Sequence, residues 1–446
     1  MEQNKKRRAL EIGKDVLIVL LACSALWLAA HTQLGRPLHA LIWEEEPRAS
    51  SGYEQGEIRA EAALPMAMAV NIPGEMAGPD GETALARYGV QYDQEGCQTL
   101  FQQVAGPLVE ALSSAGAPER ITREQWEEVL HATPGVYMDF QGYIPMRVLT
   151  GWLVGEERDW PATVRRLVLS VWEDGVALCY HDQKDGGYYR CQSEVADPVT
   201  LMDTLSAWTG NGALFAFESE HYAQLAPDTL LLETIPAQGT YTASNPVGGG
   251  QADLEEIIQD LGFSLNTTSF YSADEQVARN EDDSVRLSDR GVLVYTAGEN
   301  SGRYTVAGAR GMATLEDSVE LCRQLVMTTL GARCGEARLY LMSAEATQTG
   351  WEIEFGYQLN GVPVRLERGY AARFLVEGEQ VTQFTLYFRN YVSGGDTASP
   401  LPLRQAIAAL VAEGLEGEEL VLIYPDSGGD TLTAGWAVRA GGAGEE

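Results

Sequence analysis

One alternating stretch in the last third of the chain constrains the fold more than any other feature. In "WEIEFGYQL", residues 351–359, every second side chain is apolar, from Trp351 to Leu359. A period of two is typical of a strand that buries one face. A turn at Asn360-Gly361 follows, and then a second extended run over residues 362–366. The stretch therefore predicts two strands in the interior of a sheet.

Other patterns predict helices packed on antiparallel strands. Thr122 and Gln125 have the spacing of a capping box at the start of a helix. Residues 163–195 predict three antiparallel strands joined by two Asp-Gly turns. Helices are expected over 314–331 and 402–414, and each precedes two strands, so a helix–strand–strand unit occurs at least twice. We therefore expect an α+β fold with antiparallel sheets.

The chain has 446 residues, enough for two or three domains with cores of their own. The glycine-rich segment "NPVGGGQ", residues 245–251, breaks the pattern and is expected to separate domains. We predict an N-terminal α+β domain over 58–240, a central region over 251–310 and a C-terminal domain over 311–446.

The first 57 residues predict a membrane anchor. Residues 1–15 are a basic tail, and the uncharged run that begins at Val16 supports a transmembrane helix over 16–34. Positive charge before the span predicts a cytoplasmic N-terminus. Residues 35–57 are a polar juxtamembrane linker. We expect a single-pass protein of the cell membrane with the bulk of the chain extracytoplasmic.

Three other interpretations of this segment compete with a membrane anchor. A cleaved signal peptide needs small residues before the cleavage point, and Leu28 occupies the −3 position for cleavage after Ala30. A lipoprotein would use Cys23 of "LLAC", but the apolar run continues beyond that cysteine. A buried core helix is disfavoured by the basic cluster in front of the run. The uncleaved signal anchor is the favoured interpretation.

The span carries a stripe of mostly small residues at helical spacing: Ile18, Ala22, Ala25 and Ala29. Such a stripe allows another membrane helix to approach closely. Alanine is also common in spans that pack against nothing, so both interpretations stay open.

The charge balance limits the partners. The chain has 64 acidic and 31 basic side chains, a net charge of −33. A body this acidic repels phosphate backbones, so no nucleic-acid partner is expected. A basic partner surface suits it better than an anionic lipid face.

The cysteines allow two disulfides. Cys179 and Cys191 flank a turn, and Cys322 and Cys334 bracket the end of a predicted helix. Buried free thiols are the alternative for both pairs.

A search for catalytic motifs gives no site. The sequence contains no P-loop, G-x-S-x-G, H-E-x-x-H or S-x-x-K pattern, and five histidines offer little for a metal. "RNEDDS", residues 279–284, lacks the spacing of a calcium loop and predicts a solvated loop. "PDSGGD", residues 425–430, predicts a hairpin turn. We assign no catalytic, cofactor or metal residues, and an exported hydrolase that uses carboxylates is the enzymatic alternative.

Three stretches resemble one protein family. "LGFSLNTTSFYSADEQVARNEDDSVRLSDRGVLVYTA", residues 261–297, resembles the central part of YycH-type proteins. "GWEIEFGYQLNGVPVRL", residues 350–366, with "VTQFTLYFRNY", residues 381–391, resembles the PepSY-like repeats at the C-terminal end of YycH and its sister YycI. "LVLIYPD" and "LTAGWAVR", within 420–439, resemble the closing strands of that family.

The resemblance implies a role without catalysis. Proteins of this family are membrane-anchored, extracytoplasmic regulators of a WalK-type sensor histidine kinase in two-component signalling, with cell-wall homeostasis downstream. They require no cofactor. The expected partners are the kinase's membrane helices and ectodomain, a sister YycI/YycH-type protein, and the membrane through residues 16–34. An exported PepSY-type module that binds a wall component or inhibits a protease is the alternative.

Overall fold

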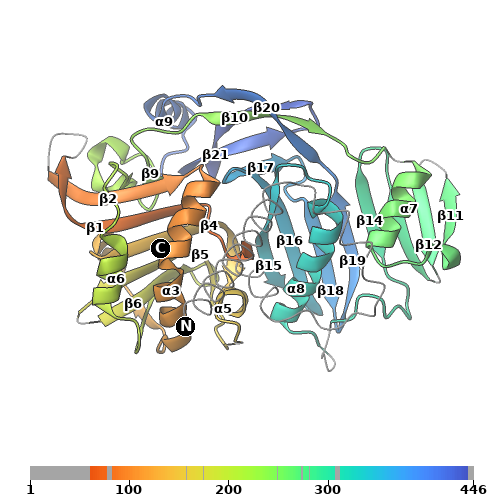
Figure 1. The fold of residues 1–446 in the computed structure, drawn as a ribbon, viewed down its shortest axis with the longest axis horizontal. Coiled ribbons are helices and arrows are strands. Elements are labelled where there is room, and N and C mark those ends of the chain that lie inside the picture. Colours follow the sequence, from red (N-terminus) through yellow and green to blue (C-terminus); the bar gives the residue numbers. More distant parts are fainter. Residues whose placement is uncertain are drawn as a thin grey trace, which may run out of the picture. The chain divides into compact units, whose positions relative to one another are not determined.

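A computed structural model describes residues 61–77, 83–156, 158–173, 175–248, 250–272, 275–280, 282–306 and 312–439. All of them belong to one compact unit, residues 56–446 (Figure 1). The predicted tail, span and stripe of the first 34 residues lie outside the described part of the chain. Within that part, no helix has both the length and the apolar character that crossing a membrane requires.

Seven strands form the first sheet, in the order β2-β1-β4-β5-β6-β7-β3, and all neighbours are antiparallel. The bounds are β1 Ala67–Ala77, β2 Thr83–Gln91, β3 Glu119–Ile121, β4 Gly135–Pro145, β5 Thr163–Trp172, β6 Gly175–Asp182 and β7 Tyr188–Gln192. Strands β5 to β7 confirm the three antiparallel strands predicted within residues 163–195.

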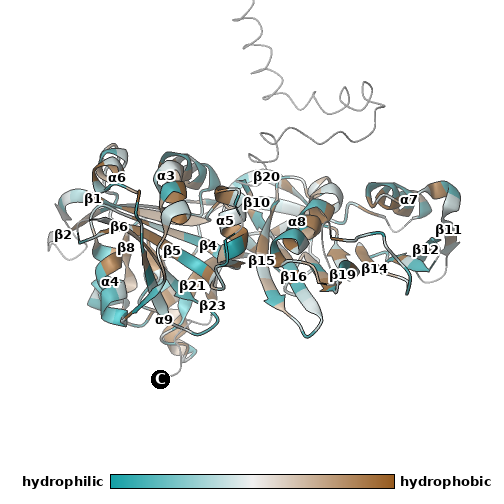
Figure 2. Ribbon diagram, turned by 90° about the horizontal axis from the view of Figure 1, so that it is seen from below, coloured by the Kyte–Doolittle hydropathy of each residue, from teal (hydrophilic) through white to brown (hydrophobic). Residues whose placement is uncertain are grey.

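Helices cover both faces of this sheet (Figure 2). Helices α3 (Gln94–Ser114) and α6 (Pro198–Leu205) lie on one face, and α4 (Arg123–His131) lies on the other. The capping box is confirmed: Thr122 accepts a hydrogen bond from the backbone of Gln125, whose side chain in turn accepts one from Thr122 N. Helix α5 (Met146–Leu153) follows β4 directly.

The second sheet has eleven strands in the order β11-β12-β13-β14-β19-β18-β16-β17-β21-β23, with β15 paired to β16. The bounds are β11 Ser269–Ser272, β12 Gln276–Asn280, β13 Asp283–Leu287, β14 Val292–Thr296, β15 Arg338–Ala346, β16 Gly350–Leu359, β17 Val362–Leu366, β18 Ala372–Glu377, β19 Gln380–Tyr387, β21 Glu419–Asp426 and β23 Gly435–Arg439. Only the β17–β21 pair is parallel among these described strands.

The alternating stretch at residues 351–359 forms strand β16. The turn that follows has the dihedral angles that its two residues favour. Asn360 has a φ of 50° and Gly361 a φ of 80°. Two positive φ angles define the hairpin turn that suits an Asn-Gly pair, because glycine carries no Cβ to clash. The chain therefore reverses directly from β16 into β17.

Helices α7 (Gln251–Asp260) and α8 (Leu315–Val326) lie on one face of this sheet (Figures 1 and 2). Thr314 caps α8 by accepting from the backbone of Asp317, as predicted, and the helix continues as a π-turn, η6 (Met327–Gly331). No described helix or strand covers the opposite face of the strands that run from β12 to β18 in the sheet order, namely β12, β13, β14, β19 and β18 (Figure 2).

Short elements connect the two sheets. Strands β10 (Gln238–Ser244), β20 (Asn390–Ala398) and β22 (Thr431–Leu432) form a three-stranded sheet, and α9 (Leu403–Ala412) precedes β21. Strands β8 (Leu214–Phe215) and β9 (Leu230–Leu231) have two residues each and pair with each other. The remaining short helices are η3 Ala216–Glu218, η4 Glu220–Tyr222 and η5 Leu265–Thr267. The α+β class with antiparallel sheets is confirmed.

Candidate functional site

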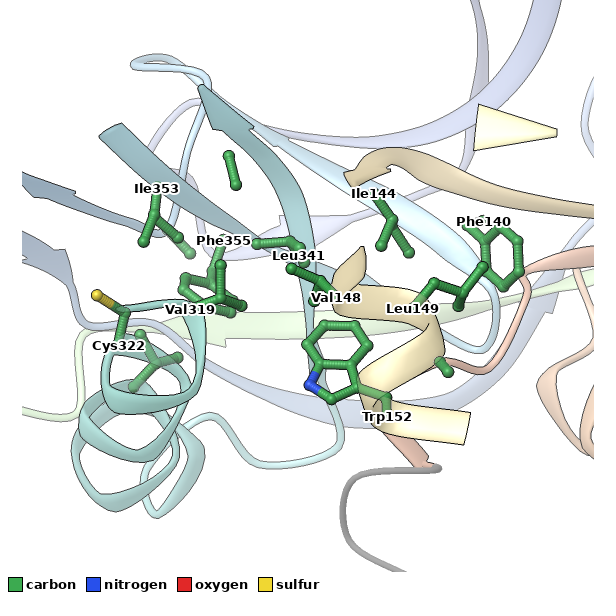
Figure 3. Close-up of a cluster of buried hydrophobic side chains, with 14 of the residues drawn as sticks. Phe140, Ile144, Val148, Leu149, Trp152, Val319, Cys322, Leu341, Ile353 and Phe355 are labelled. Carbon is green, nitrogen blue, oxygen red and sulfur yellow. The ribbon is translucent and has the colours of Figure 1, made fainter. Parts of the chain in front are cut away.

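The joint between the two sheets is the candidate site, and an apolar cluster forms its first part. Val148 and Trp152 of α5 lie beside Leu341 of β15 and Phe355 of β16 (Figure 3). Gly142, in the irregular middle of β4, brings the strands unusually close. A Cβ on this glycine would lie 2.0 Å from the carbonyl oxygen of Leu341, so no larger residue fits without moving a backbone.

A pocket of about 370 Å³ opens beside this cluster. It lies within the size range of small-molecule sites, and helices α3, α5 and α8 and strands β15 and β16 line it. Trp152 and Tyr340 supply aromatic surface, and Arg338 and Gln98 supply polar groups. Glu61, the first described residue, lies on its wall. The pocket therefore adjoins the N-terminal end of the described part of the chain.

Buried charges form the second part of the joint. Arg165 of β5 donates to Asp139 of β4 through Nε at 2.9 Å and Nη2 at 2.7 Å. The same guanidinium donates to Glu419, the first residue of β21, with Nη2 at 2.8 Å. The two acids are 2% and 5% exposed, and Arg165 is 8% exposed. A strand of the first sheet and a strand of the second are thus joined by ion pairs out of water.

A β-bulge explains how two consecutive arginines reach this cluster. Between Val164 and Leu167 the register of β5 shifts against β6, so Arg165 and Arg166 oppose a single position. Both side chains then leave the same side of the strand. Arg166 approaches Glu419 at 3.0 Å through Nη2, so both guanidinium groups contact that carboxylate.

Further polar groups complete the cluster. Asp228 lies 3.5 Å from Arg166, accepts from Arg123 at 2.8 Å and accepts from the Trp126 indole at 3.3 Å. On the other side, Arg439 of β23 donates to Gln141 at 2.7 Å. Three carboxylates and several guanidinium groups therefore form ion pairs with one another, as buried charges require, although the buried Nε of Arg166 has no hydrogen-bond partner in the described part of the chain.

The electrostatics of Glu419 follow from this geometry. Burial raises its pKa, but Arg165 and Arg166 lower it more, so the pKa of Glu419 lies well below its usual range. The neighbouring cavity, lined by Asp139 and Glu419 among others, measures about 10 Å³, which is room for roughly one water molecule. Two carboxylates do converge here, but both are bound by Arg165 in a space too small for a substrate.

A disulfide between Cys179 and Cys191, one of the two alternatives for this pair, is not formed. Cys179 pairs across the hairpin with Arg190, and Cys191 pairs with Leu178, so the register differs by one residue from the one assumed. A shift of one residue reverses the face of a strand. Cys179 accordingly lies in the core under α4, and Cys191 lies in the core under α3. Cys179 and Cys191 are buried free thiols.

The second predicted disulfide is not formed either. Cys322 is a buried free thiol on α8, and Cys334 Sγ lies 3.1 Å from the carbonyl oxygen of Ala337, to which it donates. Among the described residues, no group of three or more His, Cys, Asp or Glu side chains is placed to hold a metal ion.

One acidic segment differs from prediction, and a second, at the predicted hairpin turn between β21 and β23, contains a buried carboxylate. Asn280 and Asp283 of "RNEDDS" are buried rather than solvated, because Arg303 donates to both, at 3.0 and 3.1 Å. Asp426 of "PDSGGD" ends β21 before the turn and accepts from Arg389 at 2.7 and 2.8 Å. In both places a distant arginine compensates the burial.

The buried charges of the joint were missed by the sequence interpretation. Two adjacent arginines inside the apolar strand "TVRRLVLSV", residues 163–171, were the available signal. Strict alternation would bury one of them in the core, which requires either a bulge or acidic partners. The structure contains both.

Comparison with known proteins then decides the fold. No protein-family model matches the chain, and no curated protein matches its sequence. The crystal structure of YycH from Bacillus subtilis matches with a TM-score of 0.53 and 8% sequence identity, covering 86% of this chain and 95% of that chain. The chain has a YycH-like fold. The resemblance seen in three sequence segments thus extends to the arrangement of most of the folded chain, although few residues are identical.

The 8% identity supports the fold alone.

Proposed function

We propose that this chain is a non-catalytic, membrane-anchored regulator of a WalK-type sensor histidine kinase, with its folded body outside the cell membrane. The YycH-like fold carries the proposal, since it agrees with the family resemblance of the central and C-terminal segments. The basic tail and apolar run of residues 1–34 support a single-pass anchor with a cytoplasmic N-terminus.

In this proposal the membrane helix is the effector. The stripe of Ile18, Ala22, Ala25 and Ala29 packs against a kinase helix and favours one of its two signalling states. A differential contact of about 1–3 kcal/mol is enough, the usual range of allosteric coupling. The folded body binds the kinase ectodomain or a sister YycI-type protein and positions the helix.

The joint supports a positioning role rather than catalysis. A catalytic carboxylate pair needs open space for a substrate and a group poised to exchange protons. Asp139 and Glu419 instead share Arg165 in a cavity of about 10 Å³. Such a cluster is suited to holding two sheets in a fixed relation.

The test replaces residues 16–34 with an unrelated membrane span of equal length in cells that carry the kinase. We expect phosphorylation of the response regulator to change to the level seen without the chain. The matched control replaces only Val16 and Val19, which lie off the stripe, with leucine. Unchanged signalling in the swapped chain, at equal membrane abundance, would contradict the helix-packing role.

A second experiment tests the partner. The detergent-solubilised full chain is used to recover its interaction partners from membranes. Recovery of the kinase or of a sister protein supports the proposal, and recovery of a secreted protease instead would favour the inhibitor alternative.

A further inference from the structure

The uncovered side of the second sheet is a defined surface, which we call the outer face. It consists of the side chains of β12, β13, β14, β19, β18, β16 and β15 that point away from α7 and α8 (Figure 2). Burial alternates along the strands: Leu293 and Tyr295 of β14 are fully buried, whereas Val292 and Val294 are half-buried. The outer face therefore exposes apolar surface that no described element covers.

One end of the outer face is basic. Arg279 of β12 and Arg286 of β13 are both exposed, and no ion pair joins either one to any residue in the described part of the chain. Exposed arginines without an acidic partner among the described residues are notable in a chain whose net charge is −33. Arginine is also enriched at protein interfaces.

The other end is acidic. Glu345 of β15 lies directly opposite Glu352 of β16, a pairing of like charges that destabilises a sheet. Glu354 follows on the same face. Burial raises the pKa of Glu354, and Glu352 and Glu345 raise it further against the opposing effect of Arg373. This end holds more negative charge than its own cations compensate.

The strand register places the two ends symmetrically about β19. Arg286, Val294, Thr385, Arg373 and Glu354 form one continuous row of cross-strand partners. Arg286 and Glu354 are each two strands from Thr385 in this row.

A second row has the same symmetry. It runs through the cross-strand partners Arg279, Ser284, Thr296, Gln383, Leu375, Glu352 and Glu345. Arg279 and Glu345 are each three strands from Gln383. Charges of opposite sign thus occupy equivalent positions on either side of β19.

We propose that the outer face binds the outer face of a second copy of this chain. A two-fold axis along β19 places Arg286 over Glu354 of the other copy and Arg279 over Glu345, and each contact occurs twice. Tyr387, half-buried on β19, lies near the axis, where Tyr370 and Arg368 of the same chain pack against its ring. The inference goes beyond the proposed kinase role and does not depend on it.

The size of the outer face is sufficient for such a dimer. Seven strands about 4.8 Å apart and about 16 Å long bury on the order of 1,000 Å² in total, near the lower limit for a specific interface. Two twisted sheets can stack in this way, as they do inside β-sandwiches.

Charge reversal tests the arrangement. The full chain in detergent is measured by light scattering, corrected for the micelle, at concentrations up to about 100 μM, where dimers with a Kd in the micromolar range are populated. We expect a mass of two chains for the unmodified protein. Arg279→Glu with Arg286→Glu should give one chain, and so should Glu345→Arg with Glu354→Arg.

Mixing the two reversed chains should restore the two-chain mass, because each acidic end then meets a basic end. This rescue also shows that both variants are folded. The matched control is Arg120→Glu with Arg404→Glu, which changes the net charge equally at exposed sites off the outer face and should keep two chains. A one-chain mass for the unmodified protein, reversals that leave the dimer intact, or a mixture that stays monomeric would each overturn the proposal.

Discussion

Replacing Glu419 with glutamine tests whether buried charges hold the two sheets together. The change keeps the shape of the side chain but removes its charge, so Arg165 and Arg166 lose the carboxylate that both contact. Removing one partner of a buried ion pair costs about 3–5 kcal/mol, because the remaining charge is left uncompensated. We expect the free energy of unfolding to fall by this amount, a large share of the 5–15 kcal/mol typical of a folded protein.

Urea denaturation of the full chain in detergent, followed by tryptophan fluorescence, measures the effect. The matched control is Glu416→Gln, an exposed acid three residues away, which should change stability by less than about 0.5 kcal/mol. If Glu419→Gln were as stable as the control, the charge cluster would not hold the joint.

The pH dependence gives an independent check. Because the folded pKa of Glu419 lies below its unfolded value of about 4.3, its contribution is present above that pH and is lost as the pH falls toward the folded pKa. The stability difference between the unmodified chain and Glu419→Gln should therefore be constant above about pH 5 and shrink below pH 4. A difference that grew on acidification would refute the assignment of the charge.

Three further predictions concern single positions. Gly142→Ala should destabilise the chain by about 1–3 kcal/mol, since the added methyl group would meet the Leu341 carbonyl. Gly151→Ala, which has open space around it, should not destabilise the chain. Thermal unfolding of the two variants compares them. Thr122→Ala removes the cap of α4 and should cost about 1 kcal/mol in urea denaturation, and a change below 0.3 kcal/mol would contradict the cap. Cys179 and Cys191 should resist maleimide in the folded chain and react with it in urea. Burial raises the thiol pKa of both residues, to about 12 for Cys191. Peptide mapping that found either cysteine labelled at once in the folded chain would contradict their burial.

Features that depend on a few neighbouring residues could be predicted from the sequence. The Thr122–Gln125 cap, the Asn360-Gly361 turn and the cap at Thr314 were predicted because the hydrogen bonds or dihedral angles involved lie within a few positions. The antiparallel hairpins of residues 163–195 belong to the same class, since their turns are short.

The joint could not be predicted in this way. Arg165 and Glu419 are 254 positions apart, and nothing local marks a glutamate after a turn as the partner of a particular arginine. The cysteine prediction failed for a finer reason. Two cysteines that flank a turn face each other only in one register, and a shift of one residue is enough to place Cys179 on the opposite face from Cys191.

The strength of the joint bears on how a regulator of this form can act. Coupling between two sites is usually worth about 1–3 kcal/mol, whereas separating the ion pairs at Glu419 costs about 3–5 kcal/mol. A partner bound to the second sheet therefore displaces the first sheet as a unit before it breaks the joint. Glu61, the first described residue, lies on the wall of the pocket beside the same joint. Under the proposed function, Glu419→Gln should keep partner binding and weaken its effect on the kinase, and a variant that lost both equally would show that the joint serves folding alone.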